Sequence, residues 1–405
     1  MLKPGTIFCP NCCKTHTIPR YTSGSYPVAV DLHHKGQKYG IVERLIPNND
    51  PTNNDPPPDL PIGIQLESVV ESEFTGLPET IIVTYPGVSN PVRMWRACPH
   101  CFRKYDLAAM GTLPTFIIGM VGVRSSGKSA LLNSMAFRSH VRDVNVTNYP
   151  ITLDIYPEPD KHGVAKATIK LGRGMTKLIT LQNRSTLRPI AHVLLLDVSG
   201  ELFGDAKNYD TTQHAMKYDP EDIDELTNIL SGTGGYHGVD AVIFADPVPG
   251  SKDNTSNALM FNATQIMNNC RLLNPNFANL PMAYVFTHLD HYNNNIKDFP
   301  SYKKDPNGSR SYPLLSPQTF LNTSYAPDRL IDRIYTEDSI ARSLPEFVPM
   351  GRNLALTKGF LVSSCHCETR PGFGDVEDYT YSRNVMDPLL WILNKLRLFP
   401  LTNGG

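Results

Sequence analysis

Residues 115–129 read Thr-Phe-Ile-Ile-Gly-Met-Val-Gly-Val-Arg-Ser-Ser-Gly-Lys-Ser. The opening run is apolar and has the length and composition of a buried parallel strand. The remainder fits the pattern G-x-x-x-x-G-K-[ST], whose fixed positions are Gly122, Gly127, Lys128 and Ser129. Apolar residues then recur at helical spacing from Ala130 onward. Strand, loop and helix in this order predict a phosphate-binding loop.

The residue types of this loop suit a polyphosphate with a bound metal ion. Glycines let the backbone wrap the phosphates, and the following helix presents its positive end to them. We expect Lys128 to neutralise the β- and γ-phosphates, and the Ser129 hydroxyl to bind Mg²⁺, which prefers oxygen ligands. The rest of the nucleotide-binding loop is contributed by Ser125, Ser126 and Ala130.

Bulk composition sets the broad class of the chain. Its 405 residues are enough for two or three domains, and its formal net charge of −1 gives no overall attraction to nucleic acid or anionic membrane. No apolar run approaches the roughly 18 residues of a membrane span, and the N-terminus does not read as a signal peptide. We therefore expect a cytoplasmic protein whose eight cysteines are thiols or metal ligands.

Two C-P-x-C elements predict a zinc site. Cys9 and Cys12 form the first pair, and Cys98 and Cys101 form the second. Four thiolates in two short turns suit tetrahedral Zn²⁺. Because 85 residues separate the two pairs, we expect a zinc ribbon split by an insertion. Ordinary buried or redox cysteines are the alternative, and Cys13 reads as a spare thiol or an alternate ligand.

The predicted fold is α/β, a doubly wound and mostly parallel sheet preceded by a small β-rich zinc-ribbon domain. We place the ribbon in residues 1–110 and the phosphate-binding domain in residues 111–405, with a surface insertion near 291–325. Strands are expected at 64–70, 80–85, 115–121, 164–171, 176–182, 192–197, 239–246, 282–287 and 358–363. Helices are expected at 128–138, 220–230, 255–273, 328–342 and 383–397.

Three further strand ends carry polar motifs in an informative order. Val193–Gly200 is an apolar strand ending in D-x-x-G, where Asp197 is placed to bind Mg²⁺ through water and the Gly200 N–H to contact the γ-phosphate. A second strand ends in T-x-x-D at Thr287 and Asp290, and a carboxylate there can accept two hydrogen bonds from guanine but not from adenine. A third strand ends in Ser363 and Ser364, whose backbone suits the guanine carbonyl.

Together these motifs resemble the pattern of P-loop GTPases of the translation-factor-related class, over roughly residues 115–398. The Ser-Ser-Gly-Lys-Ser loop and the T-x-L-D motif look most like dynamin-type GTPases, although only about 40 residues follow the last motif, so we do not expect the long helical stalk of a dynamin. A zinc ribbon ahead of a stalkless GTPase is similar to the double-GTPase proteins of bacterial conflict systems, which implies a role in antiviral defence. The resemblance implies GTP or GDP with Mg²⁺ as ligands.

Several positions depart from the family pattern. His288 stands where the family has a lysine that stacks on the base, Arg124 stands where small GTPases have glycine, and Glu201 stands where they have the glutamine that orients water. These departures predict slow hydrolysis, with Arg124 and Glu201 as candidate catalytic residues. The switch threonine that binds Mg²⁺ is either Thr147, which we favour, or Thr152.

The sequence therefore predicts a GTP-hydrolysing switch that reports its nucleotide state to a protein partner or a second GTPase. Assembly into a homo- or hetero-oligomer is compatible with this prediction. One alternative is a GTP-binding scaffold with little turnover, whose function is nucleotide-dependent assembly. Another is a zinc-ribbon NTPase that binds nucleic acid, which the acidic residues interspersed among the basic ones of the first hundred positions make less favourable.

Overall fold

The structure of the chain is a computed structural model, in which the chain forms two compact units. One is Met1–Phe116 with Gly235–His237, and the other is Ile117–Gly234 with Gly238–Gly405. The structure describes the backbone of residues 1–10, 12–17, 27–34, 37–45, 65–71, 78–84, 92–93, 96–97, 100, 104–105, 111–122, 126–140, 151–156, 162–164, 177–198, 209–210, 215–216, 220–247, 265–287, 356–362, 366–370, 374–378 and 385–398.

The first unit is built from short antiparallel strands. Hairpins join β1 (Thr6–Phe8) to β2 (Thr15–Thr17), β3 (Pro27–His34) to β4 (Gln37–Leu45), and β8 (Arg96–Ala97) to β9 (Lys104–Tyr105). A three-stranded sheet contains β5 (Gln65–Glu71), β6 (Pro78–Thr84) and β7 (Val92–Arg93), which confirms the strands expected near 64–70 and 80–85.

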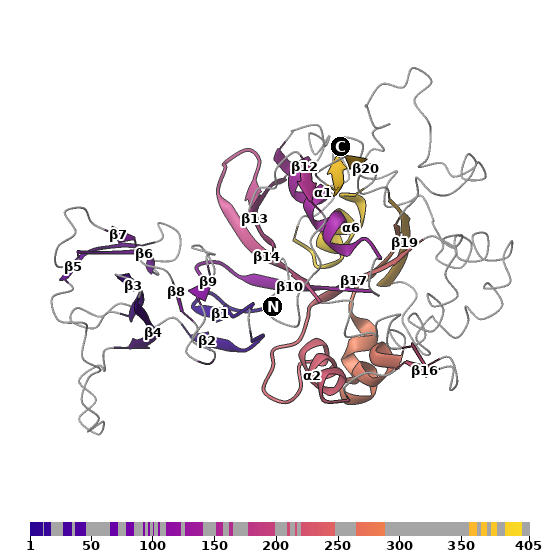
Figure 1. Ribbon diagram of the computed structural model, residues 1–405, viewed down its shortest axis with the longest axis horizontal. Coiled ribbons are helices and arrows are strands. Elements are labelled where there is room, and N and C mark those ends of the chain that lie inside the picture. Colours follow the sequence, from indigo (N-terminus) through magenta and orange to yellow (C-terminus); the bar gives the residue numbers. More distant parts are fainter. Residues whose placement is uncertain are drawn as a thin grey trace, which may run out of the picture. The chain divides into compact units, whose positions relative to one another are not determined.

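The second unit centres on a seven-stranded mixed sheet in the order β11-β13-β14-β10-β17-β18-β19 (Figure 1). Its strands are β10 (Thr115–Val121), β11 (Ile151–Tyr156), β13 (Lys177–Asn183), β14 (Pro189–Asp197), β17 (Ala241–Pro247), β18 (Met282–Thr287) and β19 (Thr357–Leu361). β10, β17, β18 and β19 pair in parallel, whereas β13 is antiparallel to both β11 and β14. The expected α/β sheet is therefore present, with an antiparallel edge.

The order of the strands reverses at β10. The chain passes from β10 to β11, β13 and β14 on one side, and then continues from β17 to β19 on the other. The N–H of Val198, which follows β14, donates to the Met120 carbonyl at 3.1 Å, so β14 and β10 end at the same edge. Ligands of open α/β sheets bind at such a reversal, outside the carboxyl ends of the strands.

Helices cover both faces of this sheet (Figure 1). α1 (Lys128–His140) and α6 (Asp387–Lys395) lie on one face, and α2 (Pro220–Ser231) lies on the other beside helical residues 265–273 and the short 3₁₀ helix η4 (Pro275–Asn279). Every residue of β10 is buried, as its uninterrupted apolar sequence predicts for a central strand. On the α6 side, Phe360 of β19 meets Trp391 edge to face, with 6.0 Å between ring centroids.

Most expected elements are confirmed within a few residues, including the helices at 128–138, 220–230 and 383–397. β14 begins three residues earlier than expected, at Pro189. The expected helix 328–342, the insertion 291–325 and residues 255–264 and 165–171 lie outside the described residues. β11 was not expected from the sequence, and neither was the small sheet β12-β21-β20, which is formed by β12 (His162–Val164), β20 (His366–Arg370) and β21 (Gly374–Asp378). A two-stranded ribbon, β15 (Tyr209–Asp210) with β16 (Ala215–Met216), was also not expected.

The glycine-rich turn before β17 gives a test of the fold. Gly238 has φ +84°, and a Cβ on it would lie 2.9 Å from the Cα of Gly232. Gly235 has φ +87°, but nothing lies within 4 Å of its added Cβ. We expect Gly235→Ala to reduce the free energy of unfolding by about 1–2 kcal/mol, the cost of a left-handed alanine. Gly238→Ala should cost at least about 1 kcal/mol more because of the backbone clash. Urea denaturation of both variants measures the difference, and equal losses would contradict the packing of this turn.

Candidate functional site

The predicted phosphate-binding loop connects the carboxyl end of β10 to the first turn of α1. Gly122 leaves β10 with φ +154°, and a Cβ there would lie 2.3 Å from the Ala245 carbonyl oxygen of the neighbouring strand β17. Gly127 also has a positive φ, +76°, and its carbonyl accepts the Leu131 N–H at 2.8 Å, which starts α1. The two pattern glycines therefore stand at the two places where the backbone requires them.

Lys128 lies inside the loop. Its side chain is only 5% exposed, and its Nζ donates to the Gly122 carbonyl at 2.6 Å and lies 3.5 Å from the Ser126 hydroxyl. The ammonium group is thus held over the same loop whose N–H groups are expected to bind phosphate. An oxyanion placed there would meet a positive charge that water does not screen.

Burial lowers the pKa of Lys128 to about 8, although the nearby Asp197 carboxylate acts in the opposite direction. A lysine in this state is a stronger ligand for phosphate than a solvated one, because little hydration must be removed. A polyphosphate beside it would favour the charged form and raise the pKa again.

The Ser129 hydroxyl donates to Asp197 Oδ2 at 2.9 Å, although 68 residues separate the two in sequence. Asp197 is the last residue of β14 and is 4% exposed, and Ser129 lies in the first turn of α1. The D-x-x-G aspartate and the loop serine are therefore hydrogen-bonded to each other, and their binding of Mg²⁺ stays a prediction. Their hydroxyl and carboxylate oxygens are hard donors of the kind Mg²⁺ selects, so these two residues fit the expected ion.

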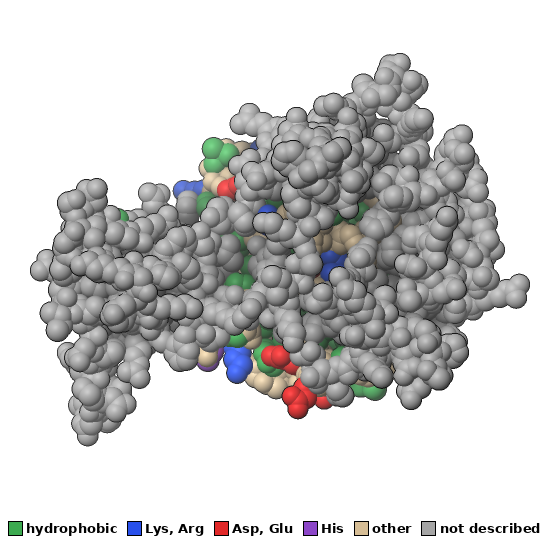
Figure 2. Space-filling view, in the orientation of Figure 1, with side chains coloured by type: hydrophobic (Ala, Val, Ile, Leu, Met, Phe, Trp, Pro, Cys, Tyr) green, Lys and Arg blue, Asp and Glu red, His purple; other side chains and the backbone are tan. Residues whose placement is uncertain are grey.

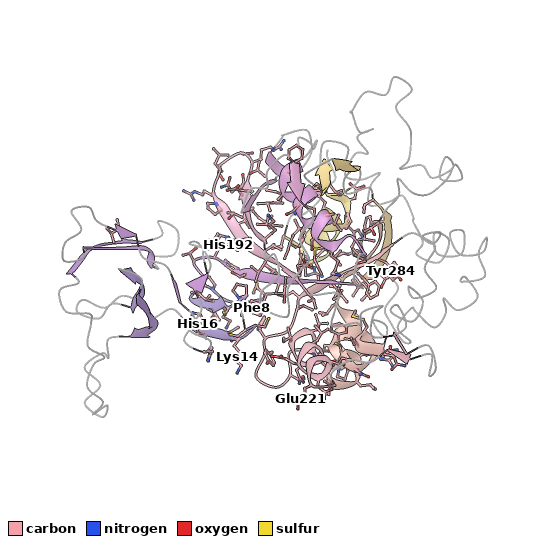
Figure 3. All side chains as sticks on the ribbon, viewed as in Figure 1. Phe8, Lys14, His16, His192, Glu221 and Tyr284 are labelled. Carbon is pink, nitrogen blue, oxygen red and sulfur yellow. The ribbon has the colours of Figure 1, made fainter. Side chains whose placement is uncertain are left out.

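Thr287 supports the loop from the other side. It ends β18, is fully buried, and its Oγ1 donates to the Ser126 carbonyl at 2.6 Å. The T-x-x-D motif predicted a contact between Thr287 and the nucleotide, and that contact stays a prediction. The hydrogen bond from Thr287 to the loop backbone was not expected, because a T-x-x-D pattern does not show which backbone group its threonine reaches. In the adjacent core, Tyr284 of β18 stacks on Phe244 of β17 with 5.0 Å between centroids (Figure 3).

A second buried lysine, also missed from sequence, stands at this edge. Lys177 is the first residue of β13 and pairs with Leu195, two residues before Asp197. Its side chain is buried, and burial lowers its pKa to about 8. The local sequence Thr-Lys-Leu-Ile does not distinguish a buried lysine from one on the surface. Only the pairing of β13 with β14 shows that Lys177 is close to the strand end that carries Asp197.

The structure also bears on the switch threonine. Thr152 pairs with Gln182 in β13, and its hydroxyl donates to the Gln182 side chain at 3.4 Å. Thr152 is near the first residue of β11. The last residue of β11, Tyr156, pairs with Leu178, which is next to Lys177 in β13. Because Asp197 lies at the Lys177 end, Thr152 is the wrong candidate. Thr147 lies outside the described residues and stays a prediction.

The remaining expected site residues have no described side chains. They are Arg124, Ser125, Thr147, Gly200, Glu201, His288, Asp290, Ser363, Ser364, Cys98 and Cys101. Two of these groups follow closely on placed strand ends, since β18 ends at Thr287 and β19 at Leu361. Because β17, β18 and β19 are parallel to β10, both strands end at the edge that carries the loop.

The strand pairs that flank the two C-P-x-C elements in sequence are joined by a contact of His100 with Thr15. Cys9 and Cys12 lie between β1 and β2, where the Cys13 N–H donates to the Cys9 carbonyl at 2.8 Å and Cys13 adopts φ +56°. β8 and β9 flank Cys98–Cys101. The His100 Nε2–H donates to the Thr15 carbonyl at 3.1 Å, and the rings of His100 and His16 meet edge to face at 6.4 Å. Figure 3 marks Lys14 and His16 on the first hairpin.

This contact brings together segments that are 85 residues apart, as a split ribbon requires. The first pair of cysteines is suitably buried or half-buried, and the turn places both in one short loop. Among the described side chains, however, no group of three or more His, Cys, Asp or Glu residues is arranged to hold a metal ion. A ribbon zinc ion therefore stays a prediction that requires Cys98 and Cys101.

Comparisons with known proteins give distant similarities of fold. No protein-family model matches the chain, and no curated protein matches it. The solved septin GTPase domain from Chlamydomonas reinhardtii is similar at 13% identity and a TM-score of 0.33, over 69% of this chain and 91% of that one. The cytosolic domain of the T. maritima FeoB iron transporter, in apo form, is similar at 11% identity and a TM-score of 0.21, over 44% of this chain and 46% of that one. The G domain of the same transporter is similar at 11% identity and a TM-score of 0.20, over 44% of this chain and 74% of that one.

The chain thus spans less than half of the FeoB cytosolic domain and most of the septin domain. Among the helices that the structure describes, none has the length and apolar character needed to cross a bilayer.

The approach of β17 to the loop predicts a strict requirement for glycine at position 122. We expect Gly122→Ala to abolish nucleotide binding, because the added methyl group would lie 2.3 Å from a backbone oxygen that cannot rotate away. Gly119→Ala is the matched control on the same strand, where the methyl group meets only Leu230 and Val239 side chains at 3.2 Å. Binding of a fluorescent GTP analogue measures both. Full binding by Gly122→Ala would contradict the loop geometry.

The lowered pKa of Lys128 predicts how nucleotide affinity depends on pH. Below about pH 8 the free protein already carries the charged lysine, so affinity should be flat between pH 7 and 7.5. Above pH 8 binding must take up a proton, and affinity should fall by up to about tenfold per pH unit. Calorimetry of Mg²⁺–GTP binding between pH 7 and 9 checks the slope. Lys128→Arg should lose this slope and Lys177→Met should keep it; the reverse pattern would assign the titration to Lys177.

Proposed function

We propose that this chain binds GTP together with Mg²⁺, hydrolyses it slowly, and passes its nucleotide state to a protein partner. The observation that carries the proposal is the meeting of Lys128, Ser129 and Asp197 at the strand-order reversal beside Gly122. A lysine held over a glycine turn, next to a hydroxyl–carboxylate pair, is the arrangement that phosphoryl transfer by positioning and charge stabilisation requires.

Each residue has a distinct part in the proposed reaction. Lys128 neutralises the phosphates, and Ser129 holds the metal ion with Asp197 behind it. When bound, Mg²⁺ supplies further neutralisation of the phosphate charge. Gly200 offers its N–H to the γ-phosphate, and Glu201 orients the attacking water. Arg124 is the candidate for added positive charge in the transition state.

Base selection is assigned to Asp290, three residues beyond the placed Thr287. Two hydrogen bonds to a carboxylate are each worth about 1.5–3 kcal/mol, which together correspond to at least about a hundredfold preference. His288 would stack on the base, and Ser363 and Ser364 would contact its carbonyl.

The proposed partner is a protein, either a second copy or a second GTPase, and not nucleic acid. The described surface of α2 supports this choice, because its exposed charged side chains are acidic (Figure 2); they are Glu221, Asp224 and Glu225. Such a face repels phosphate backbones. The zinc ribbon, held by Cys9, Cys12, Cys98 and Cys101, would be a structural or docking module. Cytoplasmic location and a role in bacterial defence are part of this proposal.

Titration calorimetry with GTP, GDP and ATP in Mg²⁺ tests the assignment. We expect guanine nucleotides to bind, and Asp290→Ala to lose about a hundredfold of the preference over ATP. Asp154→Ala, which removes an exposed carboxylate on β11, is the matched control and should leave the preference unchanged. Single-turnover hydrolysis with and without cell extract then measures turnover. Equal binding of ATP and GTP by the wild-type chain would refute the GTPase proposal.

A further inference from the structure

The hairpin between β13 and β14 presents a leucine in a strained conformation. Leu187 has φ +55°, in the left-handed region that glycine favours and that other residues adopt at a cost. Its N–H donates to the Asn183 carbonyl at 2.7 Å, which holds the turn in this shape. The Asn183 side chain accepts the N–H groups of Ser185 and Thr186 at 2.9 and 3.0 Å. These hydrogen bonds make residues 183–188 an ordered tip, called the hairpin tip below.

Neither backbone geometry nor packing explains a leucine at position 187. Glycine or asparagine would suit the left-handed backbone better. The leucine side chain is 67% exposed, so burial in a core does not offset the strain. A strained residue that the surrounding turn holds in place points to a function. An exposed apolar side chain on an ordered tip suits a contact with a partner.

Two arginines give the hairpin tip a positive charge. Arg188 is exposed, and Arg184 is half-exposed. No aspartate or glutamate occurs between Asp160 and Asp197, so the hairpin has no carboxylate of its own to balance the two arginines. A surface complementary to the hairpin tip would therefore be both apolar and acidic.

An acidic surface is present on α2 in the same unit. The exposed charged side chains that the structure describes on this helix are Glu221, Asp224 and Glu225 (Figure 2). The helix contains no lysine or arginine. Its outer face is therefore negatively charged, opposite in sign to the hairpin tip.

Helical residues 265–273 add apolar side chains beside α2. The two helices pack together, since the Asn274 Nδ2–H donates to the Ser231 carbonyl at 2.7 Å. Leu272 and Leu273 lie next to this contact in sequence and are 73% and 51% exposed. The three carboxylates of α2 and these two leucines are called the α2 surface below.

Exposed apolar side chains are concentrated on these two surfaces. Besides Met1, the large apolar side chains that are exposed in the described part of the chain are Leu187, Ile190, Leu272 and Leu273. The first two belong to the hairpin, and the last two belong to the α2 surface. Single exposed apolar residues are common. Here, however, each pair adjoins charges of one sign, and the two signs are opposite.

We propose that the hairpin tip of one copy docks on the α2 surface of a second copy of this chain. Arg184 and Arg188 would face the carboxylates of α2, and Leu187 would meet the exposed leucines. Each chain carries both halves of this contact, whereas a bilayer would engage only the tip and leave the α2 surface without a role. The inference rests on the proposed function only for the choice of a protein as partner, and it specifies which protein.

The contact lies far from the nucleotide. β14 begins at Pro189, next to the hairpin tip, and ends at Asp197 in the candidate site. At about 3.3 Å per residue, these two ends are about 25 Å apart. This separation exceeds the range over which exposed charges interact in salt solution. Charge changes at the hairpin tip should therefore leave GTP binding unchanged.

Sedimentation velocity of the full-length chain tests the contact. At about 0.05 M salt and protein concentrations up to about 0.1 mM, we expect the wild-type chain to self-associate. A twofold dimer would contain the contact twice, and head-to-tail growth would repeat it once per chain. In either assembly, the charge-reversed variant Arg184→Glu with Arg188→Glu should weaken association at least about tenfold. Lys3→Glu with Lys14→Glu changes the net charge equally at two exposed lysines outside both surfaces and should associate like wild type.

Charge reversal on the other side allows a specific rescue. Asp224→Lys with Glu225→Lys should also weaken association at least about tenfold. An equimolar mixture of the two charge-reversed variants should associate, because each then meets opposite charge on the other. A chain with all four substitutions should self-associate again. Misfolding of either variant cannot produce this recovery, and its absence in both experiments would overturn the pairing of these two surfaces.

Leu187→Gly separates the contact from stability. Glycine relieves the left-handed strain, so the midpoint of urea unfolding should stay unchanged or rise. Self-association should nevertheless weaken by about tenfold, because the apolar part of the contact is removed. A lower midpoint together with wild-type association would assign the leucine to the fold and overturn its role in docking.

A wild-type chain that stays monomeric at low salt would overturn the proposal. If that monomer co-sediments with phosphatidylserine vesicles and the arginine-reversed variant does not, the hairpin tip belongs to a lipid surface instead. Binding of a fluorescent GTP analogue by the same samples distinguishes this proposal from the proposed function. A monomer that binds GTP would refute only the contact, whereas an associating chain that binds no nucleotide would refute only the proposed function.

Discussion

The packing of β17 against the turn after β10 is the constraint on which the candidate site depends. The Ala245 carbonyl oxygen comes so close to Gly122 that no side chain fits there. The Gly122 carbonyl accepts a hydrogen bond from Lys128 Nζ, and α1 begins at this same lysine. Thr287 of β18 then fixes the far side of the loop through the Ser126 carbonyl. Three adjacent parallel strands therefore contribute to one short turn.

Burial of charge at this edge links structure to chemistry. Lys128 is removed from water, which depresses its pKa, and Asp197 compensates only in part. The site thus contains a buried cation whose charged form a nearby anion would favour. A polyphosphate would supply such an anion, so burial of the lysine in the free protein would contribute to its affinity for the ligand. Lys177, buried at the start of β13, places a second lysine with a depressed pKa at the same edge.

Contacts between segments that are distant in sequence also join the chain in two other places. The His100 side chain and the Thr15 carbonyl join hairpins that are 85 residues apart. Backbone pairing of β21 with β12 and β20 joins a strand that precedes β13 to two strands that follow β19. The second of these pairings depends on register, because a shift of one residue would move every residue of a strand to the other face of its sheet.

The sequence by itself determined the features that depend on local pattern. Residues 115–129 specify strand, turn and helix through neighbours alone, since apolar runs, glycines and helical spacing act within a few residues. The D-x-x-G and T-x-x-D motifs were likewise recognisable at their strand ends. Tertiary structure alone decided the role of Thr287 as a fastener of the loop, the burial of Lys177, the exclusion of Thr152 and the pairing of His162 with Asp378. These properties depend on which strand lies beside which and in what register, and pairing between distant segments leaves no periodic signal in either one.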